Sequence, residues 1–298
     1  MKKIIQAIPN FSEGRDLDKI EKIVASVRGI DGVKLVNYSS DKSHNRSVIT
    51  LLGEAKSVCN ALLRLTKIII ETIDMTKHEG QHPRMGALDV CPLVPIFNIT
   101  MEETIDLARD LGKKIGDMGI PVYLYEYAAS KDHRRNLADV RRGGYEGFFD
   151  KIKDPLWQPD FGPSTMNEKS GATAVSARDV LIAFNVNLST PDRDIADKIA
   201  KKIRHIGGGL RYVKAMGVYL EEKNIAQVSM NLVNYKKTSI YSVVELIKIE
   251  AKRYGVNVIG TELIGAMPME ALLQTAQYYL QIEDITSNQI LEYNFLEE

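Results

Sequence analysis

The sequence predicts an α/β (α+β) protein made of two similar domains, each a β-sheet with helices packed on it. At 298 residues, the chain has the length of two domains of roughly 150 residues. Short β-rich runs alternate along it with amphipathic stretches of helical periodicity. The two halves also present these elements in the same order, which predicts two related folds.

The first half combines strands with amphipathic helices. The runs 33–39 and 47–53 are rich in β-forming residues and are joined by a polar segment, which predicts a hairpin with a long polar tip. Strand 87–96 contains Pro92 and Pro95, and prolines inside a strand indicate a sheet edge or a bulge. The expected elements are strand 3–8, helix 17–27, strands 33–39 and 47–53, helix 55–73, strand 87–96, helix 101–116 and strand 120–125.

The second half repeats this pattern. Its expected elements are strand 180–188, helix 191–205, strands 210–220 and 226–235, helix 239–253, strand 256–264 and helix 268–280. Both halves thus run strand, helix, strand, strand, helix, strand, which is the order of ferredoxin-like domains. No repeat of individual residues accompanies this order, so the predicted duplication rests on the elements alone.

A segment between the halves, residues 151–178, holds three prolines, two glycines and the only tryptophan of the chain, with little periodicity. We expect a long structured loop here. Its aromatic residues Trp157 and Phe161 favour a functional loop over a passive connection. The predicted domains are therefore residues 1–178, which include this loop, and residues 179–298.

Charge and cysteine content favour a cytoplasmic protein with a small-molecule partner. Lys plus Arg and Asp plus Glu each number 39, so no overall positive charge is present to hold nucleic acid. Cys59 and Cys91 lie far apart and outside any Cys/His cluster, which argues against a disulfide framework or a structural zinc site. The start carries too short an apolar run for a signal peptide, and no run is long enough to span a membrane.

The stretch HEGQH, residues 78–82, matches the His-Glu-x-x-His pattern of zinc proteases. That chemistry needs both histidines on one face of a helix. Gly80 weakens a helix by about 1 kcal/mol relative to alanine, and Pro83 follows His82 directly. We therefore expect a loop that exposes His82 and Arg84 to a ligand, with an ordinary surface histidine as the alternative.

Other polar segments lie at the ends of strands or helices, where α/β proteins commonly bind ligands. Asn10 follows the first strand, Asn45 and Arg46 precede the third strand, and Arg141 and Arg142 precede the long loop. The structural alternatives are the start of a helix after Asn10 and a solvated surface at the two arginines.

Nine separated phrases occur in one order along nearly the whole chain. They are AIPNFSEGRD, HNRSVITLLG, HEGQHPRMGALDVCPLVPI, GIPVYLYEYAA, PDFGP, SGATAVSAR, LIAFNVNL, NIAQVSMNLVNY and ELIGAMP. Together they resemble glutamate formimidoyltransferases (formiminotransferases), the folate-dependent enzymes of histidine degradation. The phrase HPRMGALDVCP is the most distinctive part of this resemblance.

The resemblance implies transfer of the formimidoyl group from N-formimidoyl-L-glutamate to N5 of tetrahydrofolate, giving 5-formimidoyltetrahydrofolate and L-glutamate. Tetrahydrofolate is then a co-substrate, and no metal is implied. The resemblance further implies a homodimer of two-subdomain chains, with folate in a groove between the subdomains. Some family members carry a cyclodeaminase domain, and the length of this chain predicts the stand-alone form.

Residue by residue, the catalytic histidine of the family falls on His82. The folate-contacting loop of the family falls on Gly162, Pro163, Ser164, Thr165, Met166, Asn167, Glu168, Lys169, Ser170 and Gly171. Ser170 stands where an aromatic residue is often expected, and the preceding residues are unusually polar. An aspartate of some members corresponds to Ser39, with Asp41 nearby, so the catalytic partner of His82 is left unassigned.

Formimidoyl transfer requires loss of a proton from N5 and delivery of a proton to the departing amine. His82 suits both steps, because the ordinary pKa of histidine is about 6.5. Carboxylates of glutamate and of the folate tail need cationic partners, since guanidinium groups bind carboxylates in a bidentate manner. The candidates are Arg46, Arg84, Arg141 and Arg142. Asn10 and Asn45 could orient the amidine or the pterin. A formyl donor and an inactive folate-binding protein are the alternative functions.

Overall fold

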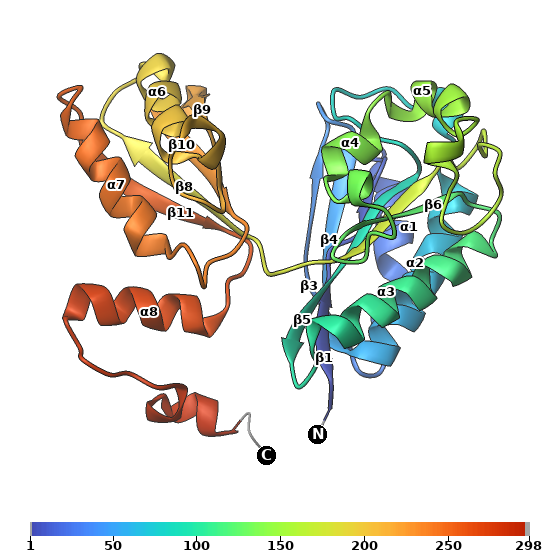
Figure 1. Cartoon of the computed structure of the whole chain (residues 1–298), viewed down its shortest axis with the longest axis horizontal. Helices are drawn as coiled ribbons and strands as arrows, with labels where there is room; N and C mark the ends of the chain where they lie inside the picture. The colour runs from blue at the N-terminus through green and yellow to red at the C-terminus, as the bar shows by residue number, and fades with distance from the viewer. Residues whose placement is uncertain (1, 296–298) are drawn as a thin grey trace. The chain divides into compact units, whose positions relative to one another are not determined.

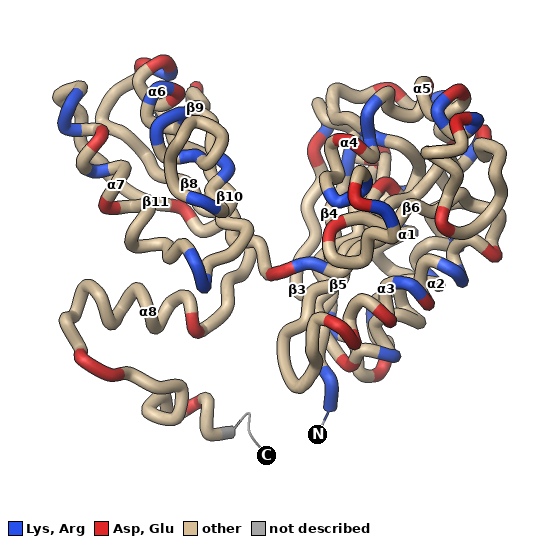
Figure 2. The backbone as a smooth tube through the Cα atoms, in the orientation of Figure 1, with Lys and Arg blue, Asp and Glu red and all other residues tan. Residues whose placement is uncertain are grey.

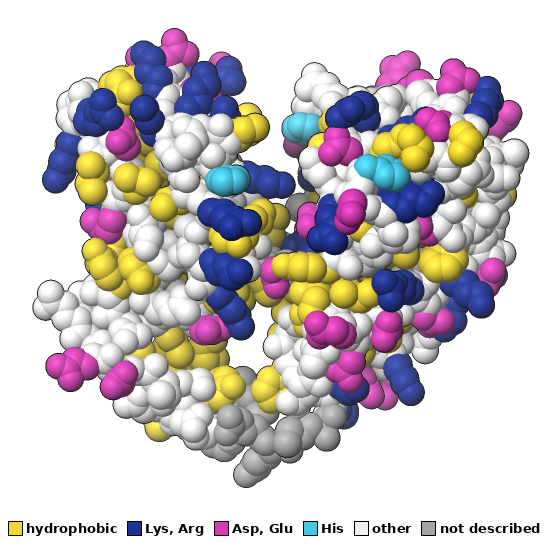
Figure 3. All heavy atoms as spheres, viewed as in Figure 1, with side chains coloured by type: hydrophobic (Ala, Val, Ile, Leu, Met, Phe, Trp, Pro, Cys, Tyr) yellow, Lys and Arg dark blue, Asp and Glu magenta, His cyan; other side chains and the backbone are white. Residues whose placement is uncertain are grey.

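The computed structural model describes residues 2–295 and divides the chain into two compact units (Figure 1). Unit 1 ends at Arg178 and unit 2 begins at Asp179. Each unit has a hydrophobic core of its own. Basic and acidic residues occur along both units (Figure 2), and side chains of both charges are present on the face drawn in Figure 3. No helix in the described part of the chain is long and apolar enough to cross a membrane.

Unit 1 holds one seven-stranded sheet with helices packed against it. Its elements are β1 (Ile4–Ala7), β2 (Asn10–Phe11), α1 (Leu17–Ala25), β3 (Val33–Asp41), β4 (Arg46–Glu54), α2 (Ala55–Thr72), β5 (Leu88–Phe97), α3 (Met101–Gly116), β6 (Val122–Glu126), α4 (Leu137–Arg141), α5 (Gly144–Lys151) and β7 (Thr173–Ala177). The predicted hairpin is present as β3 and β4, and its tip is shorter than expected because β3 continues to Asp41.

Four strands of unit 1 form a ferredoxin-like sheet. Strands β3, β4, β1 and β5 lie side by side in that order and are all antiparallel. Strand β2 prolongs β1, because it pairs with the same two neighbours. The mixed α/β architecture predicted for this half is therefore confirmed. Strands β7 and β6 extend the sheet beyond β5 through parallel pairing.

The expectation of a long loop over residues 151–178 is wrong at both ends. Helix α5 reaches Lys151, and β7 is a fully buried strand between β5 and β6. Strand β7 has the sequence TAVSA, whose small residues carry a weak β signal. Helix α4 was also not expected, since five residues are too few to show helical periodicity.

Strand β5 is not an edge strand, contrary to one of the two readings of its prolines. It pairs with β1 and β2 on one side and with β7 on the other. The other reading, a bulge, is confirmed: the register against β1 shifts between Ile4 and Ile5, next to Pro95. Pro92 has no N–H to donate, but its carbonyl accepts a hydrogen bond from the N–H of Ile8 at 3.2 Å.

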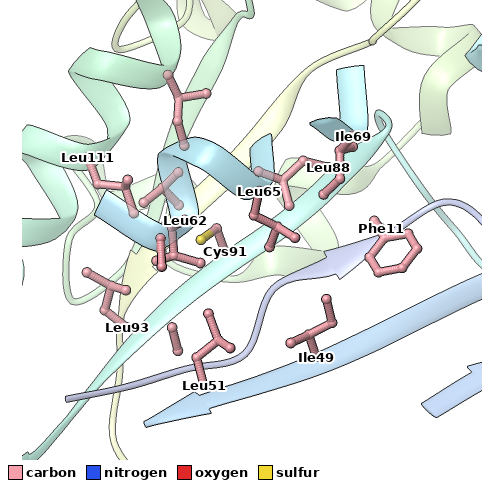
Figure 4. Packing of buried hydrophobic residues seen from close by; sticks show 14 of the residues in the cluster. Phe11, Ile49, Leu51, Leu62, Leu65, Ile69, Leu88, Cys91, Leu93 and Leu111 are labelled. Atoms are coloured by element: carbon pink, nitrogen blue, oxygen red, sulfur yellow. The ribbon is translucent and has the colours of Figure 1, made fainter. Parts of the chain in front are cut away.

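The main core of unit 1 lies between the sheet and the helices α1, α2 and α3. Leu62, Leu65 and Ile69 of α2 recur at helical spacing and face residues of β4 and β5, as Figure 4 shows. Each such side chain contributes about 1.5–3 kcal/mol when it is fully buried. On the opposite face, Tyr123 of β6 packs with Val140 of α4 and Phe148 of α5. This second layer fixes α4, which carries Arg141.

Unit 2 is a four-stranded antiparallel sheet with helices. Its elements are β8 (Ile182–Leu188), α6 (Arg193–Ile203), β9 (Val213–Leu220), β10 (Ile225–Leu232), α7 (Ile240–Lys252), β11 (Val258–Ile264) and α8 (Met269–Leu280). The strand order β11-β8-β10-β9 is the ferredoxin-like order. Strand β8 alternates buried and half-buried residues, with Phe184 and Val186 on the buried face, as expected for a sheet covered on one side.

Candidate active site

The HEGQH stretch is a loop and not a helix. A short turn over Met75–Lys77 ends before His78, and regular structure resumes only at β5. His78 and His82 therefore do not share a helix face. No group of three or more His, Cys, Asp or Glu in the described residues has the arrangement of a metal site. The loop also differs from the expectation of exposure, since His82 and Arg84 are both half-buried.

His82 contacts Arg46, the first residue of β4. Nη1 of Arg46 lies 2.5 Å from Nε2 of His82. A guanidinium can only donate hydrogen bonds, so Nε2 is the acceptor and the ring proton resides on Nδ1. The structure thus brings together two residues that are distant in sequence and were both predicted as site residues.

Arg141 and Asp89 form a buried ion pair next to these residues. Nη2 of Arg141 donates to Oδ2 of Asp89, whose side chain is 1% exposed. Oδ1 of Asp89 accepts the main-chain N–H of Met85 at 2.9 Å. Burial raises the pKa of Asp89, and the Arg141 guanidinium opposes that shift. Asp89 therefore ties the end of α4 to the HPRMG phrase.

The surroundings of His82 hold its imidazole neutral. Burial is the largest cause, followed by the positive charges of Arg46 and Arg141 and by His44, and together they lower the pKa of His82 to about 4. The main chain of Pro83 acts in the opposite direction. At neutral pH the ring is therefore neutral, and its only lone pair, on Nε2, accepts the hydrogen bond from Arg46.

His44 and Asp89 lie at this site but were not among the site residues predicted from the sequence. His44 lies with its ring centroid 6.1 Å from that of His82, and its Nδ1 contacts Oδ2 of Asp41 at 2.8 Å. No local pattern could have placed His44 there. Asp89 did carry a signal: a lone carboxylate inside the apolar run ALDVCP must be paired if that run is buried.

Arg84 is engaged away from His82. Its two terminal nitrogens donate to the two carboxylate oxygens of Glu146 at 2.9 and 2.7 Å, and its Nε donates to Nδ1 of His78 at 3.2 Å. Nε2 of His78 in turn donates to the carbonyl oxygen of Asn45 at 2.9 Å. His78, the first histidine of the HEGQH stretch, therefore links α5 to the residue that precedes Arg46.

Asn45 and Asn10 serve the local backbone. Asn45 has a left-handed φ of 49°, and its side chain accepts the N–H of Gly14 at 2.9 Å and donates to the carbonyl of Glu79 at 2.8 Å. Asn10 is buried in β2 and donates to the carbonyl of Ile8. Arg142, by contrast with its neighbour Arg141, is 78% exposed and pairs with Asp139. The structure does not bring Arg142 to the His82 group.

The segment 162–171 adjoins the HPRMG phrase through its main chain. The carbonyl of Ser170 accepts the N–H of Ala87 at 2.8 Å, and Gly171 forms an isolated bridge with Gly86. Inside the segment, Oδ1 of Asn167 accepts the N–H groups of residues 169 and 170. The polar side chains that looked unusual in sequence therefore include one that shapes the loop.

Family comparisons agree with this arrangement of two units. The model of the formiminotransferase domain, N-terminal subdomain, matches residues 4–178, and the model of the formiminotransferase domain matches residues 183–293. The chain belongs to the formiminotransferase family. The chain is 52% identical to a glutamate formimidoyltransferase of Streptococcus pyogenes serotype M1, over 99% of this chain and 100% of that protein.

Two further relatives are less similar in sequence. The chain is 46% identical to a glutamate formimidoyltransferase of Thermoplasma acidophilum, over 97% of this chain and 96% of that protein. It is 40% identical to a formimidoyltransferase-cyclodeaminase of Gallus gallus, where the match covers 96% of this chain and 54% of that protein.

Proposed function

We propose that this member of the formiminotransferase family transfers the formimidoyl group from N-formimidoyl-L-glutamate to N5 of tetrahydrofolate and releases L-glutamate. Two relatives at 46% and 52% identity carry the name glutamate formimidoyltransferase. The observation that carries the mechanism is a neutral His82 in contact with Arg46 and close to the Arg141–Asp89 pair. This group combines a base with two sites for carboxylates.

His82 is the proton carrier in this proposal. When N5 attacks the formimidoyl carbon, the nitrogen must lose a proton, and the departing glutamate amine must gain one. A single imidazole can do both in turn. Such acid–base catalysis typically increases the reaction rate by about 10²–10⁴-fold. The ring is neutral at neutral pH, which is the protonation state that the first of these two transfers requires.

Arg46 connects binding to proton transfer. Before the substrate binds, the Arg46 guanidinium occupies the Nε2 lone pair of His82. A substrate carboxylate that draws Arg46 into an ion pair frees Nε2 to accept a proton. The same carboxylate neutralises a charge that lowers the pKa of His82, so the pKa rises toward its ordinary value. The base thus becomes effective when an acidic substrate is present.

The test compares donors with the wild-type protein. Tetrahydrofolate is mixed with N-formimidoylglutamate or with N-formylglutamate, the mixture is acidified, and the absorbance of methenyltetrahydrofolate is read. We expect signal with the formimidoyl donor. Signal with only the formyl donor would replace the proposal with formyl transfer. Tight folate binding without signal from either donor would replace it with a folate-binding protein.

We also propose that segment 162–171 contacts folate and that residues 1–178 and 179–298 act as the N- and C-terminal subdomains. The protein is, in this proposal, a cytoplasmic homodimer that works without a metal. Both cysteines are buried and unbridged, which suits a reducing compartment. Light scattering of the purified protein measures the oligomeric state directly. Turnover that survives dialysis against EDTA would support the metal-free reaction.

A further inference from the structure

Lys151, the last residue of α5, places its ammonium group on the end of α4. Nζ donates to the carbonyl oxygens of Asp139 at 2.9 Å, of Val140 at 2.5 Å and of Arg142 at 3.1 Å. A lysine ammonium has three N–H donors, so all three are used. The accepting carbonyls belong to the last turn of α4 and to the residue after it, and helix ends leave such carbonyls without partners inside the helix.

Aromatic rings cover the other side of this ammonium. Nζ of Lys151 lies 3.8 Å from the ring centroid of Trp157 and 4.8 Å from that of Phe148. These are cation–π distances, and Trp is the best partner for a cation. The ammonium is therefore enclosed between carbonyl oxygens and rings, although α5 itself is a short helix near the surface.

A buried arginine holds Trp157 in place. The side chain of Arg134 is 0% exposed, and its Nη2 donates to the carbonyls of Leu156 at 2.8 Å and Gln158 at 2.6 Å, on either side of the tryptophan. Its Nη1 donates to Asp160 at 2.9 Å. The buried Arg134 thus fixes the main chain on both sides of Trp157, and the Trp157 ring in turn gives the Lys151 ammonium a defined position.

The bonded carbonyls flank Arg141. Val140 and Arg142 are its neighbours on both sides, and Arg141 points away from them to Asp89 in the site. Helix α4 has only five residues and is followed by Gly143 with a φ of 96°. A helix this short has little stability of its own. Val140 already packs against Tyr123 and Phe148, and Lys151 adds hydrogen bonds to the main chain on both sides of Arg141.

We propose that Lys151 is a positioning residue that holds Arg141 in its place beside Asp89 and His82 by capping α4. This inference rests on the proposed function only where it assigns a substrate carboxylate to Arg141. The placement of α4 itself is independent of any activity.

The charge on Lys151 is sensitive to mildly alkaline pH. Burial, with the positive charges of Arg142 and Arg134, lowers the pKa of Lys151 to about 8, and Asp139 opposes the shift. Arg142 is paired with Asp139 and Arg134 with Asp160, and His133 packs edge-on against Trp157. The ammonium is charged at pH 7, which lies below this pKa, and because the pKa is lowered it loses a donor and its cation–π contacts already as the pH rises through about 8.

The chain offers a reporter and a matched control. Trp157 is the only tryptophan, so its emission reports on the ring that covers Lys151. Lys153 is two residues away, is 73% exposed and pairs with Asp150. The experiment uses full-length Lys151→Met, Lys151→Arg and Lys153→Met. For each we measure kcat and KM for both substrates, deuterium exchange of the amides of residues 137–143, and Trp157 emission against pH.

We expect Lys151→Met to raise KM for one acidic substrate by about tenfold, the effect of losing a charge-assisted hydrogen bond at the helix end. Its kcat should change far less, and the amides of 137–143 should exchange faster. Lys151→Arg should recover part of the loss, and Lys153→Met should match wild type. Wild-type Trp157 emission should change with a midpoint near pH 8, and Lys151→Met should abolish this change.

Two results would overturn the proposal. One is a folded Lys151→Met protein whose amide exchange over residues 137–143 is that of wild type. The other is wild-type Trp157 emission that stays constant from pH 7 to about 11, a range that also includes the ordinary pKa of lysine, about 10.4; this test needs no variant and so remains decisive if Lys151→Met fails to fold. Neither measurement requires turnover. Loss of the proposed function would instead appear as wild-type protein without product from any donor.

Discussion

The imidazole of His82 is unprotonated at neutral pH because of burial and two nearby guanidinium groups. An NMR titration of the histidine ring signals, assigned by their loss in His82→Gln, should give His82 a pKa of about 4 in the free protein. Since a lowered pKa means that the ring is neutral above it, added L-glutamate should raise the pKa by neutralising Arg46. Arg46→Met should raise it without ligand. An unperturbed pKa, near 6.5, in the free protein would contradict this account.

Adjacent arginines provide a second test at the residue scale. Arg141 pairs with buried Asp89, whereas Arg142 is exposed and pairs with Asp139. We expect Arg141→Met to lower kcat/KM by at least about a hundredfold, because it also leaves Asp89 buried without its cation. Arg142→Met should change kcat/KM by less than about threefold, as surface ion pairs contribute little. Steady-state kinetics of the two variants measures both effects. Equal losses of kcat/KM would favour direct substrate contact by both arginines.

Residue types at the site were predictable to a limited depth. The sequence indicated Arg46 and Arg141 because polar residues lie there near the ends of elements, and it indicated His82 through its Gly- and Pro-containing loop and through the family resemblance. It could not indicate that both terminal nitrogens of Arg84 donate hydrogen bonds to Glu146, since these two residues lie 62 positions apart. Asn45 likewise turned out to hydrogen-bond the local backbone with its amide. Whether these two side chains also contact substrate stays a prediction.

Close contact between the HPRMG phrase and segment 162–171 is the main feature at the scale of elements. Gly171 has a φ of 69°, and a Cβ there would lie 2.4 Å from the carbonyl oxygen of Met85. Gly119 also has a positive φ, of 84°, but a Cβ there would meet nothing within 4 Å. An alanine at Gly119 would therefore cause backbone strain alone, whereas an alanine at Gly171 would cause backbone strain and a steric clash.

Gly171→Ala should destabilise the protein more than Gly119→Ala. The control should lose about 1–2 kcal/mol from the left-handed backbone alone. Gly171→Ala adds the clash with Met85 and should lose at least about 2 kcal/mol more, together with activity, because the loop carrying His82 must move. Urea denaturation measures both losses. Equal destabilisation would mean that the contact between the two segments is not tightly packed.

The longer helices and strands were predicted well because each carries a periodic apolar pattern, whereas the short helices α4 and α5 were not expected. Helix α3 begins and ends where expected, at residues 101 and 116, and its start has a capping box between Thr100 and Glu103. Strand β7 was missed because its pairing partners, β5 and β6, lie far away in sequence and its own residues are small. Parallel strands of this kind are specified by burial rather than by alternation.

The whole molecule consists of two units with separate cores. Element order alone predicted the ferredoxin-like arrangement in both halves, and strand pairing shows it in each. The extension of the unit 1 sheet by β7 and β6 was not visible in that order. It matters for function, because α4 and α5 pack on this extension and carry Arg141 and Glu146.

Separate cores predict separate unfolding. Trp157 lies in unit 1, so its fluorescence follows that unit alone, while far-UV circular dichroism follows both units. In urea we expect the two signals to give different midpoints, since coincident transitions are the mark of one cooperative system. A single shared midpoint at all wavelengths would show that the two units unfold as one.

The central claim is that His82 carries the proton in formimidoyl transfer, and replacing it tests that claim most directly. Turnover of His82→Gln is measured with tetrahydrofolate and N-formimidoylglutamate, alongside folate binding by the same protein. The account predicts that turnover falls by at least about a hundredfold while folate binding stays close to that of wild type. Wild-type turnover in a folded His82→Gln protein would contradict the account.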